Sequence, residues 1–301
     1  MKRACFTAAA VLLAAAAAAA AGRAEDTKVS SGPDSPASLL AAADGHYAAR
    51  HAGRSGARAD PSEISEAIVL YERAGAVEGE RGAEARWKLA RALYFLGSYT
   101  GLDEGTRRAV FERARRAGDE SIRLVAGRLG DADVRKLDPP ATAKLFRGDA
   151  DAAPALFWTA VAWGQWSLAS GKVEAARKGA ARRIRNDCLT LIALDPAFEE
   201  GGGYRILGRV HDQAPKIPLL TGWVSRAEAL RLLRLAVATA PRNFVNRHFL
   251  AEAVARSGSL TEAVAIEDRI VSESPGAQHL VEELAIQEAA RKNLAAWRKG
   301  E

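Results

Sequence analysis

Apolar residues recur at helical spacing through most of the chain, in segments separated by short stretches rich in proline and glycine. No stretch shows the alternation of β-branched and polar residues that is typical of strands. The pattern therefore predicts an all-α protein of about eleven helices. Their approximate ranges are 36–50, 62–76, 82–97, 105–128, 152–170, 173–194, 199–210, 225–240, 244–257, 260–273 and 276–297. Asp60-Pro61 and Asp195-Pro196 are expected at helix boundaries, because proline cannot continue a helix.

One segment has the period of a known helical repeat. Pro241 and Pro275 are 34 residues apart, which is the length of one tetratricopeptide (TPR) repeat. Within it, Leu250 and Ala251 occupy the buried and small positions of the first helix, and Gly258 falls at the turn. Two antiparallel helices approach closely only where small residues remove bulk, so these positions predict a helix pair.

The other repeats are stretched. Ala67, Tyr71 and Ala74 match the second helix of a repeat, whereas residues 210–225 form an insertion between two helices. Segment 276–297 has leucines on one side and many charges on the other, which is typical of a capping helix. We expect one modified TPR-like, solenoid-like domain over residues 37–299. Its halves, about 37–137 and 150–299, would meet at a loop around Asp138-Pro139-Pro140.

The first residues have the order of a secretory signal peptide: a basic start, an apolar run rich in alanine, then small residues at a cleavage site. We expect residues 1–24 to be removed, leaving a flexible tether at 25–36 and a periplasmic protein. A membrane anchor is the alternative, but the run is short for a span. Cys5 precedes the apolar run, so no lipoprotein is predicted. Cys188 is then unpaired and is interpreted as a core residue.

Charge and motifs argue against several functions. Loss of residues 1–24 lowers the net charge from +6 to about +3, so no nucleic-acid partner is indicated. The five histidines lack the spacing of metal ligands, and no His-Glu-x-x-His or Gly-x-Ser-x-Gly motif occurs. Gly203 and Gly208 have the glycine spacing of a phosphate loop, but Arg209-Val210 replace its lysine and hydroxyl residue. We predict a protein that binds rather than catalyses, without metal or cofactor.

Three sequence features could serve binding. Segment 154–166 carries three tryptophans, which either pack in the core or line an apolar groove, since three indoles are hard to bury without partners. Gly201-Gly202-Gly203-Tyr204 either allows close helix packing or leaves space for a ligand. Six basic residues follow closely in sequence, with Glu174 as the only acidic residue among them. They form either a solvated helix face or a docking site for an acidic protein or an anionic lipid surface. These six are Lys172, Arg177, Lys178, Arg182, Arg183 and Arg185.

Taken together, these motifs make the chain similar to the T component of tripartite ATP-independent periplasmic (TRAP) transporters. The resemblance spans roughly residues 38–276. It rests mainly on the tryptophan helix, on Leu194-Asp195-Pro196-x-Phe198 and on the repeat that ends at Pro275. It implies a non-enzymatic periplasmic protein with a central cleft or pore. It also implies a homo-oligomer, by analogy a homotrimer, that docks the solute-binding subunit of a TRAP transporter.

The resemblance further implies a hydrophobic or organic-acid solute as ligand. The residues placed near the cleft by this analogy are Phe157, Trp158, Trp163, Trp166 and Tyr204. Family members are often lipoproteins, and this chain departs from that pattern. The alternative function is a general TPR scaffold that binds a peptide or protein partner in the cell envelope.

Overall fold

The structure is a computed structural model that describes Gly32 and residues 34–299, except 78, 80, 131, 132 and 219. The predicted signal peptide (1–24) and most of the tether (25–36) lie outside these residues. Thirteen α-helices and two short 3-10 helices occur within the described part. They are α1 (Pro36–Ala48), α2 (Pro61–Ala76), α3 (Gly82–Tyr99), α4 (Glu104–Arg128), η1 (Val134–Lys136), α5 (Pro139–Phe146), α6 (Ala152–Ser170), α7 (Lys172–Arg177), α8 (Ala180–Leu194), α9 (Phe198–Gln213), α10 (Arg226–Thr239), α11 (Phe244–Arg256), α12 (Leu260–Ser272), η2 (Ala277–His279) and α13 (Leu280–Trp297).

Two local features account for the difference from the eleven predicted helices. Helix α5 was expected to be a loop, but Asp138 accepts a hydrogen bond from the Ala141 N–H at 2.8 Å, and prolines are well suited to the first helical turn. The predicted helix 173–194 is divided into α7 and α8 at Gly179, whose φ of 68° is left-handed. The all-α fold class is confirmed for the described residues.

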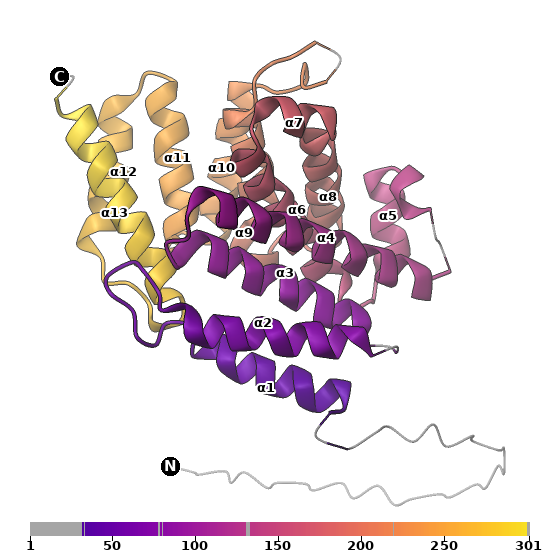
Figure 1. Ribbon diagram of the computed structural model, residues 1–301. Helices are drawn as coiled ribbons and strands as arrows, with labels where there is room; N and C mark the ends of the chain where they lie inside the picture. The colour runs from indigo at the N-terminus through magenta and orange to yellow at the C-terminus, as the bar shows by residue number, and fades with distance from the viewer. Residues whose placement is uncertain are drawn as a thin grey trace, which may run out of the picture. The chain divides into compact units, whose positions relative to one another are not determined.

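Successive helices pack against one another along the chain, from α1 on α2 through α3 and α4 to α6, α8, α9, α10, α11, α12 and α13 (Figure 1). Helix α5 packs on α8, and α7 contacts α6 and α8. One core cluster includes residues of α1 to α4 together with residues of α6, α8 and α13. The described residues from Gly32 onward therefore form one compact unit, and the two expected halves share a core.

The regular repeat lies at α11 and α12. Ala251 and Ala263 are fully buried, Leu250 is buried beside them, and Gly258 makes the turn with a φ of 96°. This confirms the helix pair predicted from the 34-residue step. The predicted insertion is also present, because α9 ends at Gln213 and α10 begins at Arg226.

The glycine run of α9 allows close packing. A Cβ at Gly202 would overlap Phe157 Cε2 and lie 2.9 Å from Cδ2, and one at Gly203 would lie 2.9 Å from Ile192 Cγ1. Real Cβ atoms do not approach other atoms this closely, so glycine is needed where α9 crosses α6 and α8. The packing interpretation of the run accounts for both glycines.

Helix α9 contains an unusual turn of left-handed backbone. Glu199 (φ 47°) and Glu200 (φ 58°) adopt a conformation that costs energy for residues with a Cβ. Asn246 holds the turn in place, because its Nδ2 donates to the Glu200 carbonyl at 2.9 Å. Arg205 Nη1 donates one hydrogen bond to the Glu199 carbonyl at 3.2 Å and another to Asn246 Oδ1 at 2.9 Å. Two buried side chains thus compensate the local strain.

The last helix contacts the first helical pair. Glu282 of α13 accepts hydrogen bonds from Arg50 Nη2 at 2.9 Å and pairs with His51 Nε2 at 2.7 Å. Both partners lie in the connection between α1 and α2, more than 200 positions earlier in the chain. The segment interpreted as a capping helix therefore also ties the C-terminal repeat to the N-terminal helices.

Candidate functional site

The structure buries four of the five residues that the resemblance placed near a cleft. Phe157 and Trp158 belong to the core cluster of the N-terminal helices. Trp163 and Trp166 belong to a second cluster with residues of α8 and α9, and Tyr204 packs on that cluster partly exposed. The five side chains are thus divided between two clusters, and none of them lines either of the two pockets described below. Their role in ligand binding stays a prediction.

The indole of Trp163 has the partner that burial requires. Its Nε1 donates to Asp119 Oδ1 of α4 at 2.9 Å. The Trp163 and Trp166 rings meet edge to face with centroids 5.4 Å apart, and the Arg115 guanidinium lies 4.7 Å from the Trp163 centroid. These contacts are favourable for aromatic groups in a core. They support the packing interpretation for this pair of tryptophans.

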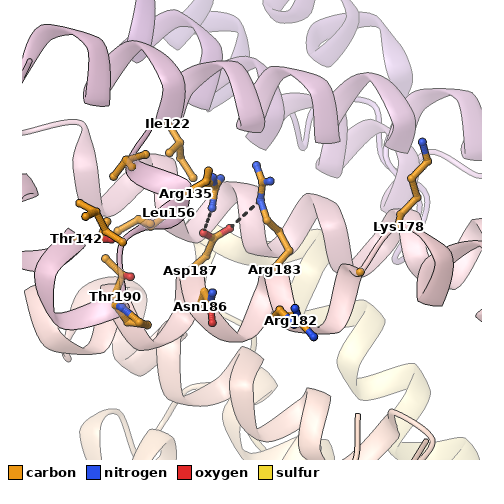
Figure 2. Close-up of a pocket in the computed structure, with 14 residues that line it drawn as sticks. Ile122, Arg135, Thr142, Leu156, Lys178, Arg182, Arg183, Asn186, Asp187 and Thr190 are labelled. Atoms are coloured by element: carbon orange, nitrogen blue, oxygen red, sulfur yellow. Dashed lines mark hydrogen bonds and ion pairs between the residues drawn. The ribbon is translucent and has the colours of Figure 1, made fainter. Parts of the chain in front are cut away.

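A pocket of about 270 Å³ opens beside this network, between α4, α5, α6 and α8 (Figure 2). We call it the cationic pocket. Four basic side chains line it, together with the acidic Asp187 and with polar and apolar residues. The full lining is Ile122, Val134, Arg135, Leu137, Pro139, Thr142, Leu156, Lys178, Gly179, Arg182, Arg183, Asn186, Asp187 and Thr190.

Asp187 is the buried centre of this pocket, with 2% of its surface exposed. Figure 2 shows its carboxylate between the guanidinium groups of Arg135 and Arg183. Arg135 donates to Oδ1, and Arg183 Nε lies 4.0 Å from Oδ2. Burial raises the pKa of Asp187, although the two arginines act to lower it. A buried carboxylate needs such partners, and the hydrogen bond with Asp187 holds Arg135 in place.

Asp119 links the cationic pocket to the tryptophan helix. Its Oδ1 accepts from Arg183 Nη2 as well as from Trp163, and its Oδ2 accepts from Arg115 at 3.0 Å. Burial lowers the pKa of Arg183, and the neighbouring Arg135 lowers it further. The charges of Arg135 and Arg183 are therefore largely compensated by Asp119 and Asp187.

Lys178 and Arg182 provide the uncompensated charge of the cationic pocket. Both side chains are exposed, and neither has an ion-pair partner among the residues that the structure describes. By contrast, Arg177 on the neighbouring helix pairs with Glu174 at 2.8 Å. Two free cations beside hydroxyl and amide groups make a site suited to a carboxylate or another oxyanion.

The size of the pocket limits what can enter it. Its volume of about 270 Å³ lies just below the roughly 300–1,000 Å³ of typical small-molecule sites. An acidic side chain would fit, with its charge toward Lys178 and Arg182 and its methylene groups against apolar residues such as Leu137. The pocket therefore has room for one or two anionic groups.

The sequence indicated only part of this site. Lys178, Arg182 and Arg183 belong to the predicted basic cluster, whereas Arg135 and Asp187 were not singled out. A local signal did exist, because Asp187 follows Arg183 by four residues, which places both on one helix face. Arg135 comes from η1 and is brought to the pocket only by tertiary packing.

No group of histidine, cysteine and acidic side chains with the arrangement of a metal site occurs in the part of the chain that the structure describes. No helix within the described ranges is both long and apolar enough to cross a membrane. Cys188 is fully buried, and burial raises the pKa of its thiol well above the usual value. It has the surroundings expected of a core residue.

Comparison with known proteins identifies the fold. No protein-family model and no curated protein matches the sequence. Among solved structures, the chain is similar to a thermophilic TPR protein from Thermus thermophilus, with a TM-score of 0.53 and 16% identity over 87% of this chain and 100% of that chain. A second similar structure is the TPR2AB domain of yeast Sti1 in a complex with pHSP90. Its TM-score is 0.31, with 14% identity over 87% of this chain and 98% of that chain.

The likeness to the Thermus protein confirms a TPR-like, solenoid-type arrangement of helix pairs. At this level of identity it concerns the fold alone. None of these comparisons points to the T-component family, so that narrower resemblance stays a prediction.

Proposed function

We propose that the protein is a TPR-type scaffold that binds an acidic segment of a partner protein at the cationic pocket. The observation that carries the proposal is the pair of unpaired cations, Lys178 and Arg182, at the rim of a pocket whose other charges are fixed by Asp187. A partner carboxylate would gain charge-assisted hydrogen bonds there without first breaking an ion pair. The TPR-like fold supports a binding function of this kind.

The structure of the pocket also explains why binding would be specific. The buried Asp187 anchors Arg135 and the partly exposed Asp119 anchors Arg183, so the two guanidinium groups need little further ordering when a ligand arrives. Thr142 and Thr190 add hydroxyl groups to the lining. The scaffold thus offers preorganised donors in a small space, which favours acidic side chains over larger ligands.

A narrower function, implied by the sequence resemblance, is that of a periplasmic T component that receives an apolar or organic-acid solute and docks a solute-binding subunit. The quoted motifs are its support. We place it second, because the side chains it assigns to a cleft, such as Trp158 and Trp166, are packed against protein. Export, oligomeric state and absence of catalysis belong to the same proposal.

The scaffold function is tested with a labelled peptide rich in aspartate and glutamate and a matched peptide in which asparagine and glutamine replace them. Fluorescence anisotropy should show binding of the acidic peptide alone, with an affinity that falls as salt is added. Lys178→Ala and Arg182→Ala should each weaken it by about 1 kcal/mol, or roughly fivefold in Kd.

Arg177→Ala is the matched control, because Arg177 is exposed on the adjacent helix and does not line the pocket. It should leave the affinity unchanged. Equal binding of the two peptides, or equal effects of Arg177→Ala and Arg182→Ala, would contradict the proposal.

The T-component function predicts a different result. Purification of the protein from its native host should then recover a solute-binding subunit, and native mass spectrometry should show an oligomer that carries a small ligand. A ligand-free monomer that binds the acidic peptide would favour the scaffold instead.

A further inference from the structure

A second pocket lies in the regular repeat, between α10, α11 and α12. Its volume is about 500 Å³, within the roughly 300–1,000 Å³ of typical small-molecule sites. We call it the repeat pocket. It is lined by Val237, Pro241, Arg242, Arg247, Leu250, Ile266, Arg269 and Glu273. No residue of the cationic pocket takes part, so the two sites are independent.

The repeat pocket carries an excess of positive charge. Three arginines line the pocket. Arg247 donates two hydrogen bonds of 2.7 Å to the carboxylate of Glu273, so Glu273 compensates the charge of Arg247. Arg242 and Arg269 are exposed and have no ion-pair partner among the described residues. The hydrogen bond from Arg247 is the main cause that lowers the pKa of Glu273, and the charges of Arg242 and Arg269 lower it further. Two cations therefore remain available to an anion.

One donor inside the pocket lining is without a partner. Arg247 is buried, with 8% of its surface exposed, and its Nε makes no hydrogen bond. A buried unpaired N–H is costly, on the order of 1–3 kcal/mol. The Nε atom itself is buried, so a ligand oxygen reaches it only if the Arg247 side chain shifts, and the exposed Arg242 and Arg269 are the donors open to an anion.

The rest of the lining is apolar. Val237, Leu250 and Ile266 come from three different helices, and Pro241 adds its ring. Such a wall takes aliphatic groups, since removing them from water is favourable by about 0.8 kcal/mol per methylene group. The pocket thus joins an aliphatic surface to a set of guanidinium groups, which selects for a molecule with both an apolar chain and an anionic end.

We propose that the repeat pocket binds a carboxylate attached to a short aliphatic chain. The carboxylate lies between Arg242 and Arg269, and the chain packs on Val237 and Ile266. This chemistry occurs in free aliphatic acids and at the C-terminus of a peptide that ends in leucine or valine. The experiment below distinguishes these two sources.

Isothermal titration calorimetry of the full chain provides the test, with octanoate, 1-octanol and octylamine as probes. Octanoate should bind with a Kd of about 1 mM or tighter, and the alcohol and the amine should not. Arg242→Ala and Arg269→Ala should each weaken octanoate binding about tenfold, the effect of losing a charge-assisted hydrogen bond. Both side chains are exposed, so neither change should affect folding.

Two controls locate the binding. Arg231→Ala changes an exposed arginine of α10 that pairs with Glu228 and lies outside the pocket lining. Arg182→Ala changes the cationic pocket. Neither variant should alter octanoate binding. Because the two pockets share no residue, octanoate should bind even if the acidic peptide does not bind at the cationic pocket.

The peptide source is tested with a short peptide ending in leucine and its C-terminal amide. Binding of the free acid but not of the amide, lost in Arg269→Ala, would support the same site with a protein terminus as its ligand. The proposal is overturned if neither octanoate nor the peptide binds, if 1-octanol binds as well as octanoate, or if Arg242→Ala and Arg269→Ala leave the affinity unchanged.

Discussion

The substitution Gly202→Ala tests how closely α9 and α6 are packed. Its added Cβ would overlap Phe157 Cε2 and lie 2.9 Å from Cδ2. The Phe157 ring cannot move away easily, because it is buried against Trp158 at a centroid distance of 4.9 Å and against Phe198 at 5.8 Å. The Arg205 guanidinium lies 5.7 Å from the same ring. The extra methyl group is therefore expected to displace a packed cluster.

Two effects set the size of the change. Alanine is favoured over glycine inside a helix by about 0.5–1 kcal/mol. Forcing a methyl group into a well-packed core costs about 1–3 kcal/mol. The second effect is larger, so Gly202→Ala should destabilise the protein by about 1–2 kcal/mol. Gly164→Ala, on α6, is the matched control, because a Cβ there meets no atom within 4 Å and only the favourable effect remains.

The free energy of unfolding of both variants can be measured by urea unfolding monitored with circular dichroism. The free energy of unfolding should fall for Gly202→Ala and rise by about 0.5–1 kcal/mol for Gly164→Ala. If both variants gain the same stability, there is no close contact at Gly202, and the role assigned to the glycine run is wrong.

Two further predictions concern polar groups. Burial raises the pKa of Glu282, but the neighbouring His279 and the charge of Arg50 lower it from 4.5 to about 2. The ionised Glu282 carboxylate stabilises the folded state by up to about 3 kcal/mol; this contribution is complete above pH 4.5 and is lost as the pH falls toward 2. Glu282→Gln should therefore lower the free energy of unfolding at pH 7 and have little effect near pH 2. A difference in urea unfolding that does not change with pH would contradict this. Asn246→Ala should cost about 2–3 kcal/mol in the same assay, because it removes bonds that hold the turn at Glu200, and an unchanged midpoint would show that the turn needs no such support.

The parts of the fold that could be predicted are those with local signals. Helix α2 begins at Pro61, and the preceding Asp60 accepts a hydrogen bond from the Ser62 N–H at 2.9 Å. This Asp-Pro pair is a helix-boundary signal that can be recognised in the sequence. The pair α11 and α12 was predicted from a period and from small residues at fixed positions. Helix α5 was missed because a proline pair was interpreted as a break, whereas proline is also favourable in a first turn.

The tryptophan helix shows why core and cleft could not be separated beforehand. Helix α6 is apolar almost all round, and such a helix is buried on several sides. It packs on α3, α4 and α8 at once. The partner of Trp163 is Asp119, an acidic residue 44 positions away whose neighbours in sequence suggest only an exposed helix face. Tertiary contacts decide whether these tryptophans lie in the core or line a cleft, and sequence periodicity carries no information about such contacts.

The candidate site was predictable in its charge but not in its shape. Lys178 and Arg182 were recognised as part of a basic cluster, and a solvated face was the simpler interpretation. The pocket arises because η1 and α5 bring Arg135 and Leu137 against α8. The sequence between α4 and α6 gave no sign of that packing.

Charge reversal at Arg182 tests the proposed function most directly. Arg182→Glu leaves the contacts of the buried Asp187 with Arg135 and Arg183 in place, because Arg182 takes no part in them. Anisotropy titrations should show that the variant loses the acidic peptide and binds a lysine-rich peptide better than the wild type does. A variant that is folded by circular dichroism and binds the acidic peptide as tightly as the wild type would contradict the account.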